Sequence, residues 1–281
     1  MISGAIADEE YSFIRKLVYD RSRINLGPNK KELVRNRLQK RLQVLGLKSF
    51  GAYCDLLNKE TGDEEKSALL DAISTNVTHF FREWKHFEFL RDIALPQLEY
   101  RPRQNPGEPL RIWSAACSSG EEPYSLAITL AEFFRNRPQF PSQTWDVFAT
   151  DISSRMLSTA SEAVYKSDRV HLPDPSWLPS YFQKGVGAWD GYYRVKSELR
   201  ERVEFNRLNL TESPHPCRHQ FDAIFCRNVM IYFDNSTQRQ LTPHLIQHLT
   251  PGGFLFVGHS EKLLGIEHGL KSLRPSIYQR V

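Results

Sequence analysis

The sequence predicts a doubly wound, Rossmann-like α/β domain, with a small all-helical domain before it and a small β-subdomain inserted into it. Three observations support this prediction. The first seventy-odd residues repeat apolar positions at helical spacing and show no strand pattern. From Pro109 onward, short apolar runs alternate with helical segments, which is typical of βαβ units and a mainly parallel sheet. Glycines and β-forming residues gather between Tyr181 and Phe205. The expected domains are residues 1–75 and 76–281, with the insertion at about 175–205.

Four amphipathic segments form the predicted helical domain. The second of them carries a stripe of leucine and valine at helical spacing. Pro28 suits the first turn of that helix, and Gly46 suits its end. The four segments are Asp8–Tyr19, Asn29–Leu45, Phe50–Leu57 and Asp63–Ile73.

The alternating part of the chain contains predicted strands and helices in turn. The strands are Leu110–Ser114, Thr144–Thr150, Phe221–Cys226, Phe254–Val257 and Ser276–Arg280. The helices are Glu121–Arg135, Ser153–Glu162 and Ser236–Leu249. Pro251–Gly253 predicts a turn before the fourth strand.

The composition is that of a chain with a packed core. The 281 residues include 40% hydrophobic residues and carry a formal net charge of +4, which excludes a disordered chain. No apolar run approaches the roughly 18 residues of a membrane span, and Met1–Tyr11 shows no secretory signal. The four cysteines are scattered, which favours reduced thiols over a disulfide framework or a zinc site. We therefore expect a cytoplasmic protein.

The segment after the first predicted strand is a candidate ligand site. Ser114–Gly120 is rich in small residues, which let a ligand approach the backbone at the carboxyl end of a strand. Glu121 and Glu122 stand where a pyrophosphate would sit, so they disfavour a dinucleotide and could attract a cationic ligand. Stabilisation of the helix dipole by these acids explains the motif about equally well.

Two further strand ends carry polar residues. Asp151 follows the second strand, where dinucleotide folds hold ribose hydroxyls, although Asn136–Ser142 lengthens its separation from Gly120. Capping of the next helix is the alternative role for Asp151. Arg227 and Asn228 follow the third strand, and a polar pair before an aromatic is unusual in an apolar crossover. These strand ends therefore favour a site.

Four motifs stand in an order that is specific to one family. They are Asn76–Arg82 (NVTHFFR), Ser114–Tyr124 (SAACSSGEEPY), Phe221–Phe233 (FDAIFCRNVMIYF) and Gly258–Glu261 (GHSE). Over nearly the whole chain, they resemble the chemotaxis receptor methyltransferases, the CheR family. The resemblance implies an S-adenosylmethionine-dependent methyltransferase sheet. It also implies methylation of glutamate side chains on chemoreceptors (methyl-accepting chemotaxis proteins), which yields methyl esters and S-adenosylhomocysteine during sensory adaptation.

The resemblance implies roles for individual residues as well. Arg82 and Tyr232 match the catalytic residues nearest the transferred methyl group. Glu122 matches the acid of the first loop, for which Glu121 is a weaker candidate, and Asp151 would hold the ribose or adenine side. The residues implied in cofactor binding are Asn76, Thr78, Arg82, Glu122, Asp151, Asn209, Leu210, Arg227 and Asn228.

The chemistry of carboxylate methylation agrees with these residue types. A glutamate side chain, with a pKa of about 4.3, is already an anion at neutral pH, so no general base is required. The donor is a sulfonium cation whose charge disappears on transfer, so the enzyme mainly aligns the reactants and excludes water. We expect Arg82 to orient the substrate carboxylate, because a strong salt bridge would quench the nucleophile. Tyr232 could hydrogen-bond that carboxylate or the methionyl end.

A basic stretch is the first candidate for receptor binding. Residues 21–48 contain nine basic side chains and one acid, and Arg37, Lys40 and Arg41 lie within about one helical turn. The pattern alone favours a solvated helix face. The resemblance favours contact with the acidic cytoplasmic helices of chemoreceptors, so we expect these three residues to bind substrate.

The insertion is the second candidate for receptor binding. Gly185, Gly187 and Gly191 resemble the glycine-bearing insertion of family members that bind a receptor's C-terminal tail peptide. An exposed strand edge could accept such a peptide by β-augmentation. A tight hairpin that needs positive φ angles is the alternative interpretation.

Three other functions compete with this hypothesis. A nucleic-acid methyltransferase of the same fold is the nearest, but the basic stretch lacks interleaved aromatics, and Asn228–Ile231 lacks an N-P-P-Y arrangement. A non-catalytic receptor-binding module is disfavoured because the motif residues are retained. Metal chemistry is disfavoured because His244 and His248 have no evident third ligand. We expect no metal, no nucleic-acid partner and no membrane insertion, and we find no role for His79 or His259.

Overall fold

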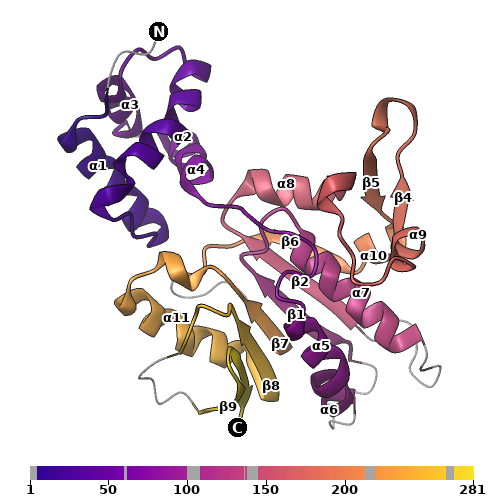
Figure 1. Cartoon of the computed structure of the whole chain (residues 1–281). Coiled ribbons are helices and arrows are strands. Elements are labelled where there is room, and N and C mark those ends of the chain that lie inside the picture. The colour runs from indigo at the N-terminus through magenta and orange to yellow at the C-terminus, as the bar shows by residue number, and fades with distance from the viewer. Residues whose placement is uncertain are drawn as a thin grey trace. The chain divides into compact units, whose positions relative to one another are not determined.

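The computed structural model describes residues 5–59, 62–99, 108–135, 137, 145–212, 219–263 and 269–281 (Figure 1). Thr144 and all of the segment 136–142 except Arg137 lie outside these residues. The chain divides into two compact units. The helical unit is Met1–Thr75 with Tyr232–Gln238, and the sheet unit is Asn76–Ile231 with Arg239–Val281. Among the described residues, none of the helices combines the length and the hydropathy that a membrane span requires.

The helical unit contains the four predicted helices, which confirms its all-helical class. Pro28 begins a 3₁₀ turn, Pro28–Lys30, that leads directly into the second helix. Ser49 caps the third helix, because its hydroxyl accepts the backbone N–H of Ala52 at 3.2 Å. The helices are α1 (Asp8–Ser22), α2 (Lys31–Val44), α3 (Phe50–Leu57) and α4 (Asp63–Ile73). Their apolar faces form a core in which Ile14, Val18, Val34, Leu38 and Leu42 are fully buried.

A later segment of the chain, Tyr232–Gln238, belongs to the helical unit. The backbone C=O of Tyr232 accepts the N–H of Asn25 at 2.8 Å, and Ile24 forms an isolated β-bridge with Phe233. The helical unit is therefore not a continuous stretch of sequence, which the local pattern up to residue 75 could not indicate.

The sheet unit is built on seven strands in the order β6-β2-β1-β7-β8-β10-β9. The five strands from β6 to β8 run parallel, and β10 runs antiparallel to both of its neighbours. This arrangement confirms the predicted doubly wound α/β class. The order reverses at β1, which lies between β2 and β7, so the ends of these strands flank the switch point. The strands are β1 (Leu110–Ala115), β2 (Trp145–Asp151), β6 (Val203–Arg207), β7 (Phe221–Cys226), β8 (Leu249–Val257), β9 (Leu270–Arg274) and β10 (Ile277–Arg280).

Helices and aromatic side chains cover this sheet. Helix α7 packs on β1, β2 and β6, and α8 packs on β2 and β6. Phe225 of β7 stacks on Phe256 of β8 with ring centroids 4.2 Å apart, and Phe80 and Phe81 are buried in the same core. The helices are α5 (Lys85–Phe89), α6 (Leu95–Glu99), α7 (Glu121–Arg135), α8 (Ser154–Glu162) and α11 (Asn235–His248), with a π-helical turn at Leu90–Ala94.

A separate three-stranded antiparallel sheet, in the order β3-β5-β4, forms the insertion. Its strands are β3 (Val164–Lys166), β4 (Phe182–Lys184) and β5 (Tyr192–Val195), with the short helices α9 (Trp177–Tyr181) and α10 (Ser197–Arg200) beside them. Figure 1 shows the β4–β5 hairpin projecting away from the main sheet. The insertion therefore begins with β3, earlier than the expected residue 175.

Three details of the main sheet differ from the sequence predictions. Val203–Arg207, expected to end the insertion, pairs in parallel with β2 as β6. Pro251–Gly253 lies within β8 and not in a turn, because Gly252 at φ +75° absorbs an irregularity in the register with β7. Strand β9 was not predicted, because it is the edge strand beside β10 and shows no buried alternation.

Candidate functional site

The segment that follows the helical unit is anchored by its two aromatics. Phe80 and Phe81 are 2% and 5% exposed, and the Phe81 N–H donates to Ser125 Oγ at 2.9 Å. Arg82 then turns back and donates from Nη1 to the Val77 C=O at 2.9 Å. Phe81 and Glu83 have φ values of +53° and +58°, which non-glycine residues rarely adopt. Buried rings thus hold a strained segment in place beside the sheet.

The loop after β1 is strained in the same way. Ala116 and Ser118 also have positive φ, at +64° and +50°. Gly120, at φ +95°, lies so close to Ala160 and Tyr165 that a Cβ would come within 2.8 Å of each. Only glycine fits there, so the small residues of this motif have a packing reason as well as the expected ligand reason.

Asp151 connects this loop to the end of β2. Its carboxylate accepts the N–H of Ser118 at 2.8 Å and the N–H of Ser153 at 2.9 Å, and the residue is 6% exposed. The cap of α8 is Ser153, whose hydroxyl accepts the Met156 N–H. Asp151 therefore ties two strand ends together at the switch point, and helix capping belongs to its neighbour.

The two acids that open α7 have different partners. Glu121 is fully buried, accepts from Ser119 Oγ at 2.7 Å and pairs with Arg169 of the insertion. Glu122 accepts from Ser114 Oγ at 2.7 Å and from Arg227 Nη1 at 3.0 Å. Burial raises the pKa of both carboxyls, against the lowering effect of their partners. Glu121 is thus committed to the insertion, whereas Glu122 faces the end of β7.

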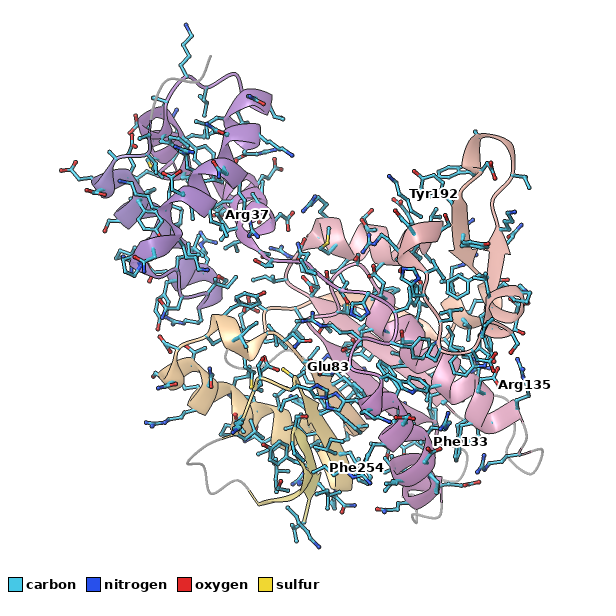
Figure 2. The ribbon with its side chains drawn as sticks, in the orientation of Figure 1. Arg37, Glu83, Phe133, Arg135, Tyr192 and Phe254 are labelled. Atoms are coloured by element: carbon cyan, nitrogen blue, oxygen red, sulfur yellow. The ribbon has the colours of Figure 1, made fainter. Side chains whose placement is uncertain are left out.

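Arg227 is the centre of the polar network at that end. Its Nη2 donates to Glu83 Oε2 at 2.9 Å and to the Arg82 C=O, and its guanidinium lies 5.5 Å from the ring centroid of Phe87. Burial alone would raise the pKa of Glu83, but the Arg227 charge and hydrogen bonds outweigh it and lower that pKa to about 2. Glu83 is therefore an anion at every physiological pH. It lies inside the sheet unit (Figure 2).

The backbone of the loop after β7 is held by Glu261. This carboxylate accepts the N–H of Asn228 at 2.8 Å and the N–H of Gly258 at 2.5 Å. Asn228 itself has φ +57°, and its Nδ2 donates to Glu83 at 3.2 Å. Sequence reasoning missed both carboxylates, although Glu261 closes the fourth motif and Glu83 directly follows the first.

The remaining residues predicted to bind cofactor also lie in the sheet unit. The Asn76 C=O accepts from Ser118 Oγ at 3.4 Å. Asn209 follows β6, where its side-chain oxygen accepts the Thr211 N–H at 3.2 Å, and Leu210 is 6% exposed. Thr78 lies within the strained first segment. Tyr232 is the exception among the predicted site residues, because it belongs to the helical unit.

Among the described residues, Glu83, His86 and His259 bring possible metal-ligand atoms within 4.8 Å of one another. The Arg227 guanidinium on Glu83 opposes a second cation at this position. Burial, followed by the Arg227 charge, lowers the pKa of His86 to about 3, so its ring is neutral. We assign no metal here.

The expected basic ridge contains residues with different surroundings. Arg37 donates to the C=O groups of Ile73 and Ser74 at the end of α4 (Figure 2). Arg41 forms a bidentate pair with the buried Glu65, whereas Lys40 is exposed. Two of the three cations therefore hold the helical unit together.

The three glycines of the insertion serve the backbone of the β4–β5 hairpin. A Cβ on Gly185 would lie 2.0 Å from the Trp189 C=O oxygen, and Gly187 and Gly191 have φ values of +60° and +80°. These are the conformational needs of a tight hairpin. At its tip, Val186 and Trp189 are 80% and 60% exposed.

The acid-lined edge fits a cationic cofactor. Glu122 and Asp151 lie around the ends of β1, β2 and β7, and a loop of small residues leaves the backbone approachable. A pyrophosphate would be repelled by these carboxylates, whereas a sulfonium and an ammonium group would be attracted. Fold and site thus define an α/β enzyme class whose ligand site, at the ends of the parallel strands, favours a positively charged group.

Comparison with known proteins identifies the family. Residues 76–278 match the family described as "CheR methyltransferase, SAM binding domain", and residues 9–74 match "CheR methyltransferase, all-alpha domain". The chain belongs to the CheR methyltransferases and uses S-adenosylmethionine as its cofactor, which confirms the predicted family, enzyme class and cofactor.

Full-length relatives agree with this assignment. A "Chemotaxis protein methyltransferase" of Salmonella typhimurium is 42% identical over 92% of this chain and 85% of its own length. Proteins of the same description from Escherichia coli and Borreliella burgdorferi are each 40% identical over 98% of this chain, and over 91% and 95% of their own lengths.

Proposed function

We propose that this protein transfers the methyl group of S-adenosylmethionine to glutamate side chains of chemoreceptors, forming methyl esters that adjust receptor signalling. The observation that carries the proposal is the match to chemotaxis methyltransferases over nearly the whole chain. The site supports it, because the strained, acid-lined edge suits a cationic methyl donor and a carboxylate nucleophile needs no base.

The residues of the sheet unit would divide the cofactor among them. S-adenosylmethionine supplies an electrophilic methyl group on a sulfonium. Asp151 and the residues after β6 would hold the ribose and adenine. Glu122 would face the cationic end, and Asn76, Thr78 and Arg82 would line the same site. Asn228 would complete the adenosyl pocket.

Arg82 would orient the glutamate that is methylated. One of its N–H groups is already bound to the Val77 C=O, which fixes the guanidinium and leaves other donors for a carboxylate. Orientation of this kind lowers the barrier without neutralising the nucleophile. Tyr232 would supply a further hydrogen bond to the substrate carboxylate or to the methionyl end.

Methyl transfer from labelled cofactor to candidate receptors tests this function. We expect an alkali-labile product on receptor glutamates, whereas an alkali-stable product or labelled nucleic acid contradicts a carboxyl ester. Arg82→Ala should lower turnover at least about 10²-fold. Arg155→Ala, which changes an exposed arginine on α8, is the matched control and should retain normal turnover. Near-normal turnover of a folded Arg82→Ala protein refutes the role of Arg82.

We also propose that the basic face of the helical unit contacts acidic receptor helices, with Lys40 as its accessible member. Lys40→Glu should raise the KM for receptor roughly threefold or more, without changing cofactor affinity. Lys59→Glu, an exposed lysine outside the basic stretch, is the control. Arg37 and Arg41 are unsuitable for this test, because their loss also disturbs α4. If Lys40→Glu and Lys59→Glu change the KM for receptor equally, the basic face has no specific role in receptor binding.

The insertion offers a place for a receptor tail peptide. Strand β4 is an edge of the small sheet and borders a pocket of about 680 Å³. Lys184, Arg194, Lys196 and Arg200 line that pocket with one acid, Glu198. An extended peptide that ends in a carboxylate matches an open edge beside a cationic pocket.

Calorimetry with receptor tail peptides tests the tether. Lys184→Glu with Arg194→Glu should abolish binding, and Lys166→Glu on the other edge strand, β3, should not. Absence of binding to any cognate tail would refute the proposal.

Because chemoreceptors present these helices and tails in the cytoplasm, we place the protein there. The free thiols of Cys54, Cys117 and Cys226 are compatible with that location.

A further inference from the structure

Two carboxylates beside the end of β7 have no part in the roles described so far. Glu83 and Glu261 both contact Asn228, and they come from opposite sides in the sequence, before β1 and after β8. Glu261 is 4% exposed, and Glu83 carries a side chain that is 14% exposed. Charges buried to this extent are costly unless they are fully paired, so each needs a structural account.

Glu261 accounts for the backbone of the loop. Its two oxygens accept the N–H groups of Asn228, Ile231 and Gly258 at 2.8, 3.2 and 2.5 Å. A side chain at Gly258 would collide with this arrangement, since its Cβ would lie 2.7 Å from Glu261 and 2.5 Å from the Asn228 amide. The course of the loop is therefore fixed without any help from Glu83.

Glu83 binds the two side chains of that loop and one backbone N–H of the segment after β8. Its carboxylate accepts from Arg227 Nη2 at 2.9 Å, from Asn228 Nδ2 at 3.2 Å and from the His259 N–H at 3.3 Å. A carboxylate can only accept hydrogen bonds, so the NH₂ group of Asn228 must face Glu83 and its carbonyl oxygen must point elsewhere. Glu83 thus decides which end of the amide is offered to a ligand.

The backbone of Glu83 shows that this placement is imposed. Its φ of +58° is unusual for a residue with a long side chain, and Phe81 two residues before it is strained in the same sense. The buried rings of Phe80 and Phe81 hold the segment in that conformation. The result is a carboxylate that reaches Arg227 and Asn228 together.

We propose that Glu83 is a positioning residue of the cofactor site, which holds the Arg227 guanidinium and turns the Asn228 carbonyl oxygen toward the bound cofactor. The inference rests on the proposed place of Asn228 in the adenosyl pocket. It assigns a task to the residue that directly follows the first motif, and the Arg227 charge on Glu83 explains why the nearby His86 and His259 do not make this position a cation site.

Calorimetry with S-adenosylhomocysteine tests the proposal. Glu83→Gln keeps the shape but places an NH₂ group against the donors of Arg227, Asn228 or His259. We expect its Kd to rise roughly 10-fold, the equivalent of one lost hydrogen bond to a charged group. Glu88→Gln, the same change at the partly exposed partner of Lys85, is the matched control and should leave the Kd within twofold.

A double-mutant cycle distinguishes positioning from general loosening. If Glu83 acts through Asn228, Glu83→Gln should weaken binding much less in the Asn228→Ala background than in the wild-type protein. If the Kd of the double variant rises by the product of the two single fold-changes, the residues act independently and the proposal is overturned. An unchanged Kd for Glu83→Gln, when Asn228→Ala weakens binding, also overturns it. An unchanged Kd for Asn228→Ala removes Asn228 from the pocket, so that the site assignment fails and not the coupling.

A second variant keeps the test valid if Glu83→Gln does not fold. Glu83→Asp retains the charge beside Arg227 but is one methylene shorter, so it cannot reach Asn228 as well. The same cycle with Asn228→Ala applies, and the same outcomes support or overturn the proposal. The melting temperature of each variant, measured without cofactor, identifies any protein that is not folded.

Discussion

Gly258→Ala introduces one methyl group at the tightest point of the loop that holds Asn228. Its Cβ would lie 2.5 Å from Asn228 Nδ2, 2.7 Å from Glu261 Oε2 and 3.0 Å from the Asn228 backbone N. Ordinary contacts begin near 3.5 Å, so the loop must move by roughly 1 Å. The move breaks the hydrogen bonds of Glu261 to Asn228 or Gly258, at about 1.5–3 kcal/mol for each bond to the charged group.

We expect two measurable consequences of Gly258→Ala. The free energy of unfolding in urea should fall by about 2–4 kcal/mol, and methyl transfer should fall by about 10²-fold, because a displacement of 1 Å misaligns the site. Gly27→Ala is the matched control, since Gly27 has φ −65° and nothing lies within 4 Å of its Cβ position. If Gly258→Ala has the same stability and turnover as Gly27→Ala, the view that Glu261 fixes the loop is refuted.

Two further predictions concern charge and burial. Burial, and next the Arg227 charge, lower the pKa of His86 to about 3, so its contribution to stability is complete above the unfolded pKa of about 6.5 and is lost as the pH falls toward 3. As the pH falls from 6.5 to 5, the free energy of unfolding in urea should fall by an amount approaching about 1.4 kcal/mol per pH unit, and His86→Gln should remove this dependence. An equal pH dependence of the unfolding free energy in both proteins contradicts the lowered pKa of His86. Among the described residues, Arg41→Ala leaves Tyr53 as the remaining hydrogen-bond partner of the buried Glu65. The change should cost about 2–3 kcal/mol of unfolding free energy, after allowance for the partial exposure of Arg41, whereas Lys40→Ala should stay within about 0.5 kcal/mol. Hydrogen exchange of the backbone amides of α2 and α4 measures the destabilisation in both variants. Equal protection in Arg41→Ala and Lys40→Ala would contradict the stabilising role of the Arg41–Glu65 pair.

Local pattern predicted most of the elements because helices and strands leave their period in the sequence. Phe50–Leu57, Asp63–Ile73 and Phe221–Cys226 were predicted to the residue, and the helix Glu121–Arg135 agrees with its approximate predicted bounds. Strand β9 was missed because an edge strand without a buried face has no period to detect.

Candidate site residues were also accessible from sequence, because parallel strands end at one edge and the motifs stand at those ends. Asp151, Glu122, Arg227 and Asn228 were singled out in this way, and the structure brings all four to the same edge of the sheet. Their roles toward the cofactor and the receptor stay proposals that the experiments above test.

The sequence by itself determined the fold class, the family and the positions of the motifs, because these depend on local period and on residue identity. Only the tertiary structure decided the partners. It separated Glu121, paired with Arg169, from Glu122, paired with Arg227, and it brought Glu83 to Arg227 across a separation of 144 residues. The physical reason is that a buried charge is defined by what surrounds it, and its surroundings come from segments that are distant in the sequence.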